Sequence, residues 1–272
     1  MRPFFSIIIP TLNEEAFLPK LLANLEKQKE RNFEVIVVDG QSEDGTRKVV
    51  QQFNSIPVRF LRVKKRNVSH QRNVGARASK GDYLVFLDAD SGIAKTFTAS
   101  LKKAIVKRKG LVFLPYLEPL EKQSQEKIFF PLANFLIELS QNTNKPFSSG
   151  GSIFFERNFF HLLGGFDERL ALAEDHDLIQ RASLWGVRVR SLPNIKVKFS
   201  LRRMKVEGKL SVFYKYVLAT AHILLKGKID KTLFTYKMGG SQYKHLEAGL
   251  SGKNSLDGQI KKIQHFFDRY LR

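Results

Sequence analysis

Residues 81–90 read GDYLVFLDAD, an apolar run that ends in two carboxylates one residue apart. The stretch from Tyr83 to Leu87 has no charged or amide side chain, which is typical of a strand buried on both faces of a parallel sheet. Asp88 and Asp90 follow at positions i and i+2, so on extended backbone their side chains point the same way. The stretch therefore predicts a central strand of an α/β sheet with acidic groups at its carboxyl end.

Strand-like and helix-like stretches alternate around residues 81–90. The other strand-like stretches are Phe4–Ile9, Phe33–Val38, Val58–Val63 and Leu111–Leu114. The helix-like stretches are Glu14–Glu30, a helix opening at Asp44-Gly45-Thr46, Ser69–Lys80 and Phe97–Lys107. This order predicts a doubly wound, mostly parallel sheet, in which ligands bind beyond the carboxyl ends of the strands. Asn13, Glu14 and Asp39 follow the first two strands, so we expect them to converge on Asp88 and Asp90.

The composition is that of a globular protein with excess positive charge. Of 272 residues, 43% are hydrophobic and 26% are charged, values that argue against a disordered chain or a coiled-coil rod. The lack of cysteine excludes disulfides, thiolate zinc sites and a cysteine nucleophile. With 46 Lys and Arg against 26 Asp and Glu, the net charge is +20, which favours nucleic acid, an acidic membrane surface or a phosphorylated substrate as partner.

The positive charge is concentrated toward the C-terminus. Residues 199–272 hold 15 Lys and Arg and 5 Asp and Glu, so they contribute +10 of the +20. Within them, Leu210 to Leu225 mixes aromatic residues with lysines, the pattern of a helix that lies on a membrane surface; a packing helix with solvated charges fits equally well. We therefore expect an α/β domain of residues 1–198 and a basic, amphipathic helical appendage of residues 199–272.

No stretch predicts a secretory signal or a membrane-spanning helix. The longest apolar candidates, Ile128–Leu139 and Val212–Leu225, both contain polar or charged residues. We expect a cytoplasmic protein, with attachment to the inner face of the membrane left open. The aromatic stretch Ile128–Ile137 fits an acceptor-side wall or a lipid-facing surface, but packing in the core is the simpler expectation.

Phosphate binding in this chain must rely on something other than a glycine cradle. Neither a Gly-x-Gly-x-x-Gly turn nor a P-loop is present. Asp88 and Asp90 indicate a divalent metal instead, because two carboxylates on one side of a segment can bind a cation together with its phosphate ligands. The alternative is that both are turn residues after a strand. Gly150 and Gly151 favour either close backbone approach to a ligand or a tight turn, and the sequence does not separate the two.

Four ordered motifs carry a resemblance to a known family. They are SIIIPTLNEE (residues 6–15), VVDGQSEDGT (37–46), RNVGARASKGD (72–82) leading to Asp90, and GGFDE (164–168) followed by EDHDL (174–178). Together they resemble the signatures of family-2 inverting glycosyltransferases with the GT-A fold.

The resemblance assigns a nucleotide-binding role to Pro10, Thr11, Asn13, Glu14, Asp39, Arg72 and Asp88. It implies that Asp39 accepts a hydrogen bond from the base, since ionised acceptors make the stronger hydrogen bonds. It also implies that Asp90 binds Mg²⁺ or Mn²⁺ directly and that Asp88 contacts the ribose or the metal. Many relatives have Asp-Asp-Gly-Ser where this chain has DGQS, so a uridine nucleotide is favoured but guanosine stays open.

By the same resemblance, Asp175 is the catalytic base, and Glu174 beside it shapes the pocket or binds the acceptor. An inverting transfer needs one carboxylate to take the proton of the acceptor hydroxyl. The competing interpretation is an acidic first turn of a helix, where carboxylates are favoured whatever the function, and both can hold. We expect His176 on the helix surface. Arg202 and Arg203 follow at a position where relatives place a cation over the diphosphate.

The sequence thus predicts metal-dependent, inverting transfer of a single sugar from a nucleoside diphosphate sugar, with a UDP-sugar favoured. The expected acceptor is a hydroxyl group, lipid-linked or on a polysaccharide. A processive synthase is disfavoured because Gln180 to Trp185 has the residues of the Gln-x-x-Arg-Trp element but not its spacing. The alternatives are a sugar-phosphate nucleotidyltransferase and a non-catalytic basic protein that binds membranes or nucleic acid. Nucleic acid is not the expected partner, because the acidic edge would repel phosphate unless a metal filled it.

Overall fold

The computed structural model describes residues 2–120, 126–143, 145–148 and 150–202, together with Ile229, Gly239 and Gly240. Most of the predicted appendage, including Arg203 and Val212–Leu225, lies outside these residues.

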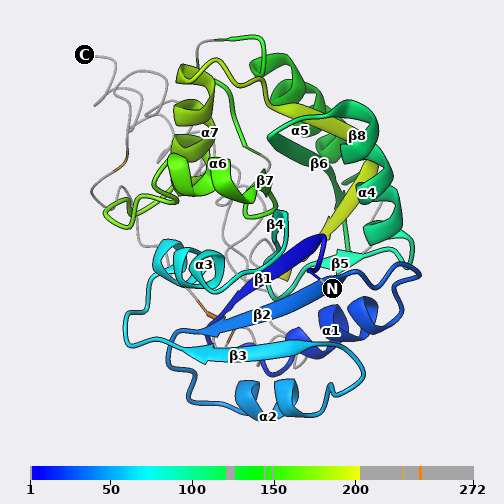
Figure 1. Cartoon of the computed structure of the whole chain (residues 1–272), viewed down its shortest axis with the longest axis vertical. Coiled ribbons are helices and arrows are strands. Elements are labelled where there is room, and N and C mark those ends of the chain that lie inside the picture. Colours follow the sequence, from blue (N-terminus) through cyan, green and yellow to red (C-terminus); the bar gives the residue numbers. More distant parts are fainter. Residues whose placement is uncertain are drawn as a thin grey trace, which may run out of the picture.

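Within the described residues, one eight-stranded sheet forms the centre of the molecule, in the order β3-β2-β1-β4-β7-β6-β8-β5 (Figure 1). The strands are β1 (Phe5–Thr11), β2 (Phe33–Asp39), β3 (Val58–Arg62), β4 (Tyr83–Phe86), β5 (Gly92–Ile93), β6 (Val112–Pro119), β7 (Phe154–Glu156) and β8 (Arg190–Phe199). The helices are α1 (Leu18–Glu26), α2 (Thr46–Gln51), α3 (Val68–Arg77), α4 (Phe97–Arg108), α5 (Glu126–Ser140), α6 (Arg157–Leu162) and α7 (Glu174–Leu184).

The mostly parallel sheet predicted from the sequence is confirmed. Strands β1 to β4 are mutually parallel where they pair, and β6 is parallel to β8. The antiparallel members are the two shortest strands, β5 and β7. Thr11 pairs with Asp39 in the register of β1 and β2, so the loops after both strands leave the sheet side by side.

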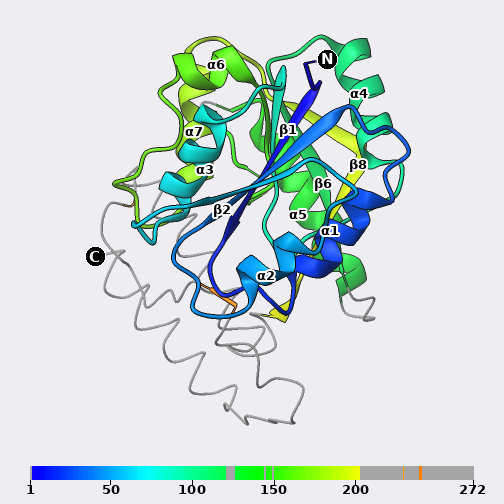
Figure 2. The same cartoon turned by 60° about the horizontal axis from the view of Figure 1, so that its bottom comes forward.

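Helices cover both faces of the sheet because strand residues alternate between them. Ile7 and Ile9 of β1 belong to a core shared with α1, α2 and α4. Ile8 faces the other way, into a core shared with α3, α6 and α7. Figure 2 shows α1 and α2 apart from α3, α6 and α7, as this division requires. The central strands β1, β2 and β4 are therefore buried on both sides, as their apolar runs predict, whereas β3 at the edge of the sheet is half-exposed.

The first helix is shorter than the prediction. α1 spans Leu18–Glu26, whereas the sequence predicted Glu14–Glu30. Pro19 lies in its first turn, a position where a missing N–H costs nothing. The N–H of Glu14 instead donates to Thr46 Oγ1 at 2.9 Å, so Glu14 stays at the sheet edge.

α5 departs from the expectation that Ile128–Ile137 packs in the core. One side of the helix lies on β6, where the Asn134 carboxamide bonds both the N–H and the C=O of Leu117. The opposite side exposes Leu132, Phe135 and other large apolar side chains. The physical reason is that only one side of α5 faces the sheet, where Phe130 and Asn134 are buried and Ile137 packs against the core shared with α3, α6 and α7. None of the helices in the described ranges is long and apolar enough to cross a membrane.

Candidate active site

The carboxyl ends of β1, β2 and β4 bring the predicted acidic residues to one edge of the sheet. Asp39 ends β2 beside Thr11, and Asp88 follows β4, the other neighbour of β1. The loop after β1 has a left-handed residue, Asn13, with φ of 55°. Non-glycine residues with positive φ are uncommon and cluster at functional sites. The convergence predicted from the strand pattern is therefore present.

Asp39 is buried and fixed by its own surroundings. Its carboxylate accepts bonds from the Thr11 hydroxyl at 3.2 Å and from the Ser42 N–H at 3.0 Å, and the Ser42 hydroxyl donates a further bond. Arg62 approaches the same carboxylate to 3.6 Å. Asp39 is only 1% exposed, so its carboxylate organises the loop after β2.

Arg202 joins the loops that follow β1 and β4. Its guanidinium donates to both oxygens of Glu14, at 2.7 and 2.9 Å, and its Nε lies 2.9 Å from Asp90 Oδ2. The same guanidinium lies over the Phe17 ring, 4.4 Å from its centroid. Stacking and two-pronged hydrogen bonding are the contacts that favour Arg over Lys. A cation is thus held against the carboxylate that the sequence assigned to metal binding.

Glu14 has a strongly shifted titration. Burial raises the pKa of Glu14 to about 7, although Arg202 favours the charged form. The negative charges of Asp90 and Asp88 act in the same direction as burial. Three carboxylates therefore share this edge of the sheet, and Arg202 offsets part of their repulsion.

Arg72 connects the loop after β4 to the first turn of α7. Its Nη2 donates to Asp88 Oδ1 at 2.8 Å and its Nη1 to Glu174 Oε1 at 2.7 Å. The guanidinium is almost fully buried and lies 5.3 Å from the centroid of the Phe166 ring. Burial would lower the pKa of Arg72, but the charges of Asp88 and Glu174 outweigh it and raise that pKa. Gly151 covers this bridge, since a Cβ on it would lie 2.4 Å from Asp88 Oδ2.

The first turn of α7 presents the predicted base. Ala173, which precedes the helix, has φ of 60°, a strained conformation for a residue with a side chain. Glu174 and Asp175 follow it, and Asp175 is buried. Burial raises the pKa of Glu174, and the opposing charge of Arg72 does not cancel this effect.

His176 is a partner of Asp175, which corrects the expectation that it lies on the helix surface. Its Nδ1 lies 3.3 Å from Asp175 Oδ1, and its ring packs against Phe147 at 5.5 Å between centroids. Burial would raise the pKa of Asp175, but the neighbouring charges of His176 and Arg72 hold that pKa below its usual range. Burial would lower the pKa of His176, and Asp175 raises it above its usual value. The Pro146 carbonyl accepts a hydrogen bond from Gln180 of α7, which holds the segment that carries Phe147 against the helix.

The sequence model of glycosyl transferase family 2 matches residues 6–164, which are more than half of the chain. The chain belongs to glycosyl transferase family 2.

Sequence relatives of this family-2 protein include an uncharacterized glycosyltransferase of Haemophilus influenzae, 33% identical over 193 residues. That match covers 64% of this chain and 60% of the relative. The poly(ribitol-phosphate) beta-N-acetylglucosaminyltransferase TarS of Staphylococcus aureus is 34% identical over 96 residues, which are 34% of this chain and 17% of TarS. The chain thus spans less than two thirds of the length of these curated relatives.

Solved structures show that the fold is of the GT-A type. The mannosyltransferase PcManGT from Pyrobaculum calidifontis, in complex with GDP-Man and Mn²⁺, matches with a TM-score of 0.65 at 21% identity, covering 84% of this chain and 71% of PcManGT. The S. aureus TarS 1-349 complex with UDP-GlcNAc matches with a TM-score of 0.59 at 19% identity, covering 97% of this chain and 80% of that chain.

Most residues of the predicted active site lie together at the sheet edge, but the side chains of some are buried or hydrogen-bonded within the protein. Pro10 is buried within β1, and the Asn13 side chain accepts a bond from the Glu43 N–H at 2.7 Å. These two residues shape the loop after β1. Asp177, in the same turn as Asp175, pairs with Arg181 at 2.8 Å and anchors the helix.

The sequence did not predict that Gly239 and Gly240 lie beside the candidate active site. The Gly240 N–H donates to the Leu12 carbonyl at 2.9 Å, and a Cβ on Gly240 would lie 2.3 Å from the Asn13 carbonyl oxygen. Residues far beyond the predicted domain boundary at 198 therefore touch the loop after β1. The adjacent Gly239 and Gly240 were the signal available in the sequence, because only glycine allows such close backbone approach.

Proposed function

We propose that this protein transfers a single sugar, with inversion, from a nucleoside diphosphate sugar to a hydroxyl group of a lipid-linked or polysaccharide acceptor. The proposal places the donor at residues 10–14, Asp39, Arg72 and Asp88, and the acceptor at Asp175. Family membership, and fold neighbours solved with UDP-GlcNAc and with GDP-Man and Mn²⁺, support a nucleotide-sugar donor. A UDP-sugar is favoured because Asp39 is retained.

The observation that carries the proposal is the bridge made by Arg72. One buried guanidinium contacts the carboxylate after β4 and the carboxylate beside the proposed base, at 2.8 and 2.7 Å. It fixes the distance between donor-side and acceptor-side groups, and such fixed positioning is a large source of rate enhancement.

The proposed base has the required ionisation. Neighbouring carboxylates whose pKa values are pushed apart take different roles in catalysis. The pKa of Asp175 is held below its usual range, so its carboxylate is ionised and able to accept a proton, whereas burial raises the pKa of Glu174. In the proposed step the acceptor O–H proton moves to Asp175 and the acceptor oxygen bonds the anomeric carbon. The bond from that carbon to the diphosphate breaks, and its electron pair leaves with the diphosphate.

A divalent metal fits the residues present. Asp88 and Asp90 offer the hard oxygen ligands that Mg²⁺ and Mn²⁺ prefer, and each already holds a cationic side chain. No group of three or more acidic or histidine side chains that could hold a metal is found among the described residues. That donor set suits Mg²⁺, which is usually bound by one or two carboxylates together with substrate phosphates. When bound, the ion would offset charge on the leaving diphosphate.

Thermal denaturation of the full chain with UDP, GDP and their sugars, with and without Mn²⁺, tests the donor site. A ligand that binds only the folded state raises the midpoint by mass action. We expect a metal-dependent rise for a uridine nucleotide in the native protein and in the Asp82→Asn control. The rise should be absent in Asp90→Asn. A response to nucleoside triphosphate with pyrophosphate release would instead indicate a nucleotidyltransferase.

A further inference from the structure

The exposed side of α5 is an apolar surface that contains none of the residues proposed for the transfer reaction. Leu132, Phe135, Leu136 and Leu139 are 53%, 59%, 51% and 55% exposed. Their spacing of i, i+3, i+4 and i+7 places them on one side of the helix. We call these four residues the apolar stripe. The side chain of Glu138, which is exposed beside it, is hydrogen-bonded to the Tyr116 hydroxyl.

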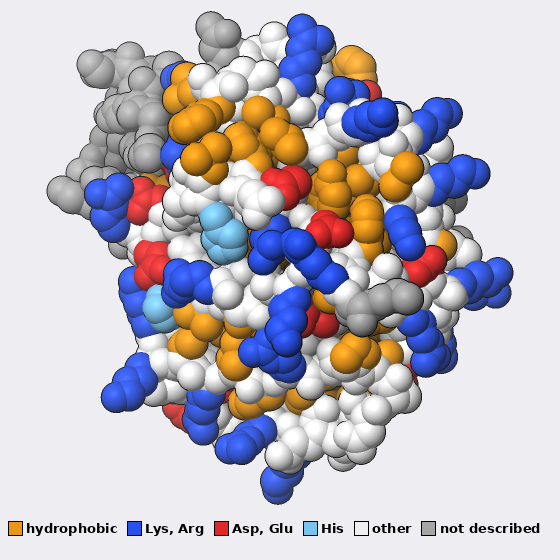
Figure 3. Space-filling view, viewed as in Figure 1, with side chains coloured by type: hydrophobic (Ala, Val, Ile, Leu, Met, Phe, Trp, Pro, Cys, Tyr) orange, Lys and Arg blue, Asp and Glu red, His pale blue; other side chains and the backbone are white. Residues whose placement is uncertain are grey.

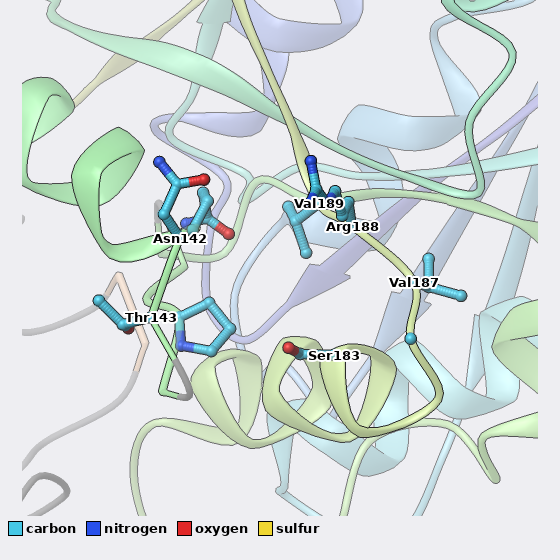
Figure 4. A pocket seen from close by; sticks show the side chains of 9 residues that line it. Asn142, Thr143, Ser183, Val187, Arg188 and Val189 are labelled. Carbon is cyan, nitrogen blue, oxygen red and sulfur yellow. The ribbon is translucent and has the colours of Figure 1, made fainter.

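A polar pocket lies beside the turn that follows the C-terminal end of α5. The Asn142 N–H bonds the Leu139 carbonyl at 3.3 Å, so the chain keeps turning as it leaves α5. Asn142 and Thr143 then line a pocket of about 270 Å³ together with Ser183 and Arg188 from the end of α7 and the segment after it (Figure 4). Arg188 is exposed and makes no ion pair within the described ranges. A hydroxyl, a carboxamide and a guanidinium are the groups that bind phosphate oxygens.

The apolar stripe and Arg188 together favour one class of partner. Aliphatic and aromatic side chains at helical spacing, next to a cationic group, are the pattern of a helix that lies in a membrane interface. The chain carries a net charge of +20, and Lys and Arg side chains are spread over the face seen in Figure 3. Such charge draws a protein to anionic lipid. A glycan would not require four large apolar side chains in a row, and a second copy of this chain would bring its positive charge against like charge.

We propose that α5 docks the protein on an anionic lipid bilayer, with the apolar stripe inserted at the interface and Arg188 binding a lipid phosphate. This inference concerns a surface apart from the proposed active site. It does not depend on the transfer reaction.

Co-sedimentation of the full chain with phosphatidylcholine vesicles, with or without phosphatidylglycerol, tests the docking surface. We expect tighter binding to the vesicles that contain phosphatidylglycerol. The double variant Leu136→Gln with Leu139→Gln should bind about tenfold more weakly, because two side chains lose their transfer from water. Leu162→Gln on α6 is the matched control, since Leu162 is 60% exposed and should leave binding unchanged.

The role of Arg188 is tested separately. Arg188→Gln should weaken binding to anionic vesicles several-fold more than Lys64→Gln, which removes the same charge elsewhere. Circular dichroism and the nucleotide-induced thermal shift show that each variant is folded, and so separate a docking failure from a failure of the proposed function. Unchanged vesicle binding in the double variant would overturn the proposal, as would a dimer in analytical ultracentrifugation that this variant dissociates. Saturation of Arg188 by inorganic phosphate without any effect on vesicle binding would overturn its lipid role.

Discussion

Arg72 Nη1 lies 2.7 Å from Glu174 Oε1, although 102 residues separate the two in sequence. The bond joins α3 to the first turn of α7. The other arm of the same guanidinium contacts Asp88. Arg72 therefore links the motif of residues 72–90 to the motif of residues 174–178.

Replacing Arg72 should damage both stability and transfer. Arg72→Met leaves two carboxylates without their cation, and breaking a buried ion pair in this way costs about 3–5 kcal/mol of unfolding free energy. Urea denaturation measures the loss, and transfer assays should show little activity even where the variant remains folded. Arg77→Met on the exposed side of the same helix should change neither quantity. Native stability in Arg72→Met would contradict the bridge.

The ionised carboxylate of Asp175 should be needed for chemistry and not for donor binding. Asp175→Asn cannot accept the acceptor proton, so we expect transfer to fall by a factor of about 10²–10⁴. Its nucleotide-induced thermal shift should stay as in the native protein. Asp177→Asn is the contrasting variant: it loses the ion pair to Arg181 and should lower stability while retaining turnover. Normal turnover by Asp175→Asn would remove this residue as the base.

Glu14 should make stability depend on pH in the absence of nucleotide and metal. Its pKa rises from 4.5 in the unfolded chain to about 7 on folding, so between these values the folded state binds more protons. The free energy of unfolding should therefore fall as the pH rises through this window, by about 3 kcal/mol at most. Urea melts across the window measure the slope. Glu14→Gln should reduce it, and a slope of the opposite sign would show that Arg202 keeps Glu14 ionised.

A methyl group at Gly151 should disturb the contact between Asp88 and Arg72. A Cβ there would lie 2.4 Å from Asp88 Oδ2 and 2.5 Å from Arg72 Nη2. We expect Gly151→Ala to cost about 1–3 kcal/mol through overpacking and to lower transfer by displacing Asp88. Gly186→Ala meets no atom within 4 Å but has positive φ, so it should cost stability alone. Equal activity losses in both variants would show that Gly151 has no special relation to the site.

Asp90 should be required for the metal dependence of transfer. Removing divalent cations with a chelator should abolish transfer by the native protein, and adding Mn²⁺ should restore it. Asp90→Asn should show little activity at any Mn²⁺ concentration tested, with its urea midpoint close to that of the native protein, because Asp90 lies at the sheet edge and not in a core cluster. Full activity in the presence of chelator would exclude a metal-dependent reaction.

The sequence by itself determined the parallel strands β1 to β4 and the gathering of Glu14, Asp39, Asp88 and Asp90 at their carboxyl ends. Apolar runs followed by polar residues report burial and its end directly, so local pattern was enough. The same local signal placed Asp175 in the first turn of a helix. The local pattern gave a wrong prediction for Ile128–Ile137. Its apolar residues predicted packing in the core, but a pattern of this kind does not show whether a second layer covers the helix.

Only the tertiary structure decided which groups act on one another. The contacts of Arg72 with Glu174, of Arg202 with Glu14 and of Gly240 with Leu12 join segments far apart along the chain. No periodicity or spacing encodes such pairs, since they arise from how helices and strands pack. The opposite pKa shifts of Glu174 and Asp175 have the same origin, because they depend on which charges burial brings beside each carboxylate.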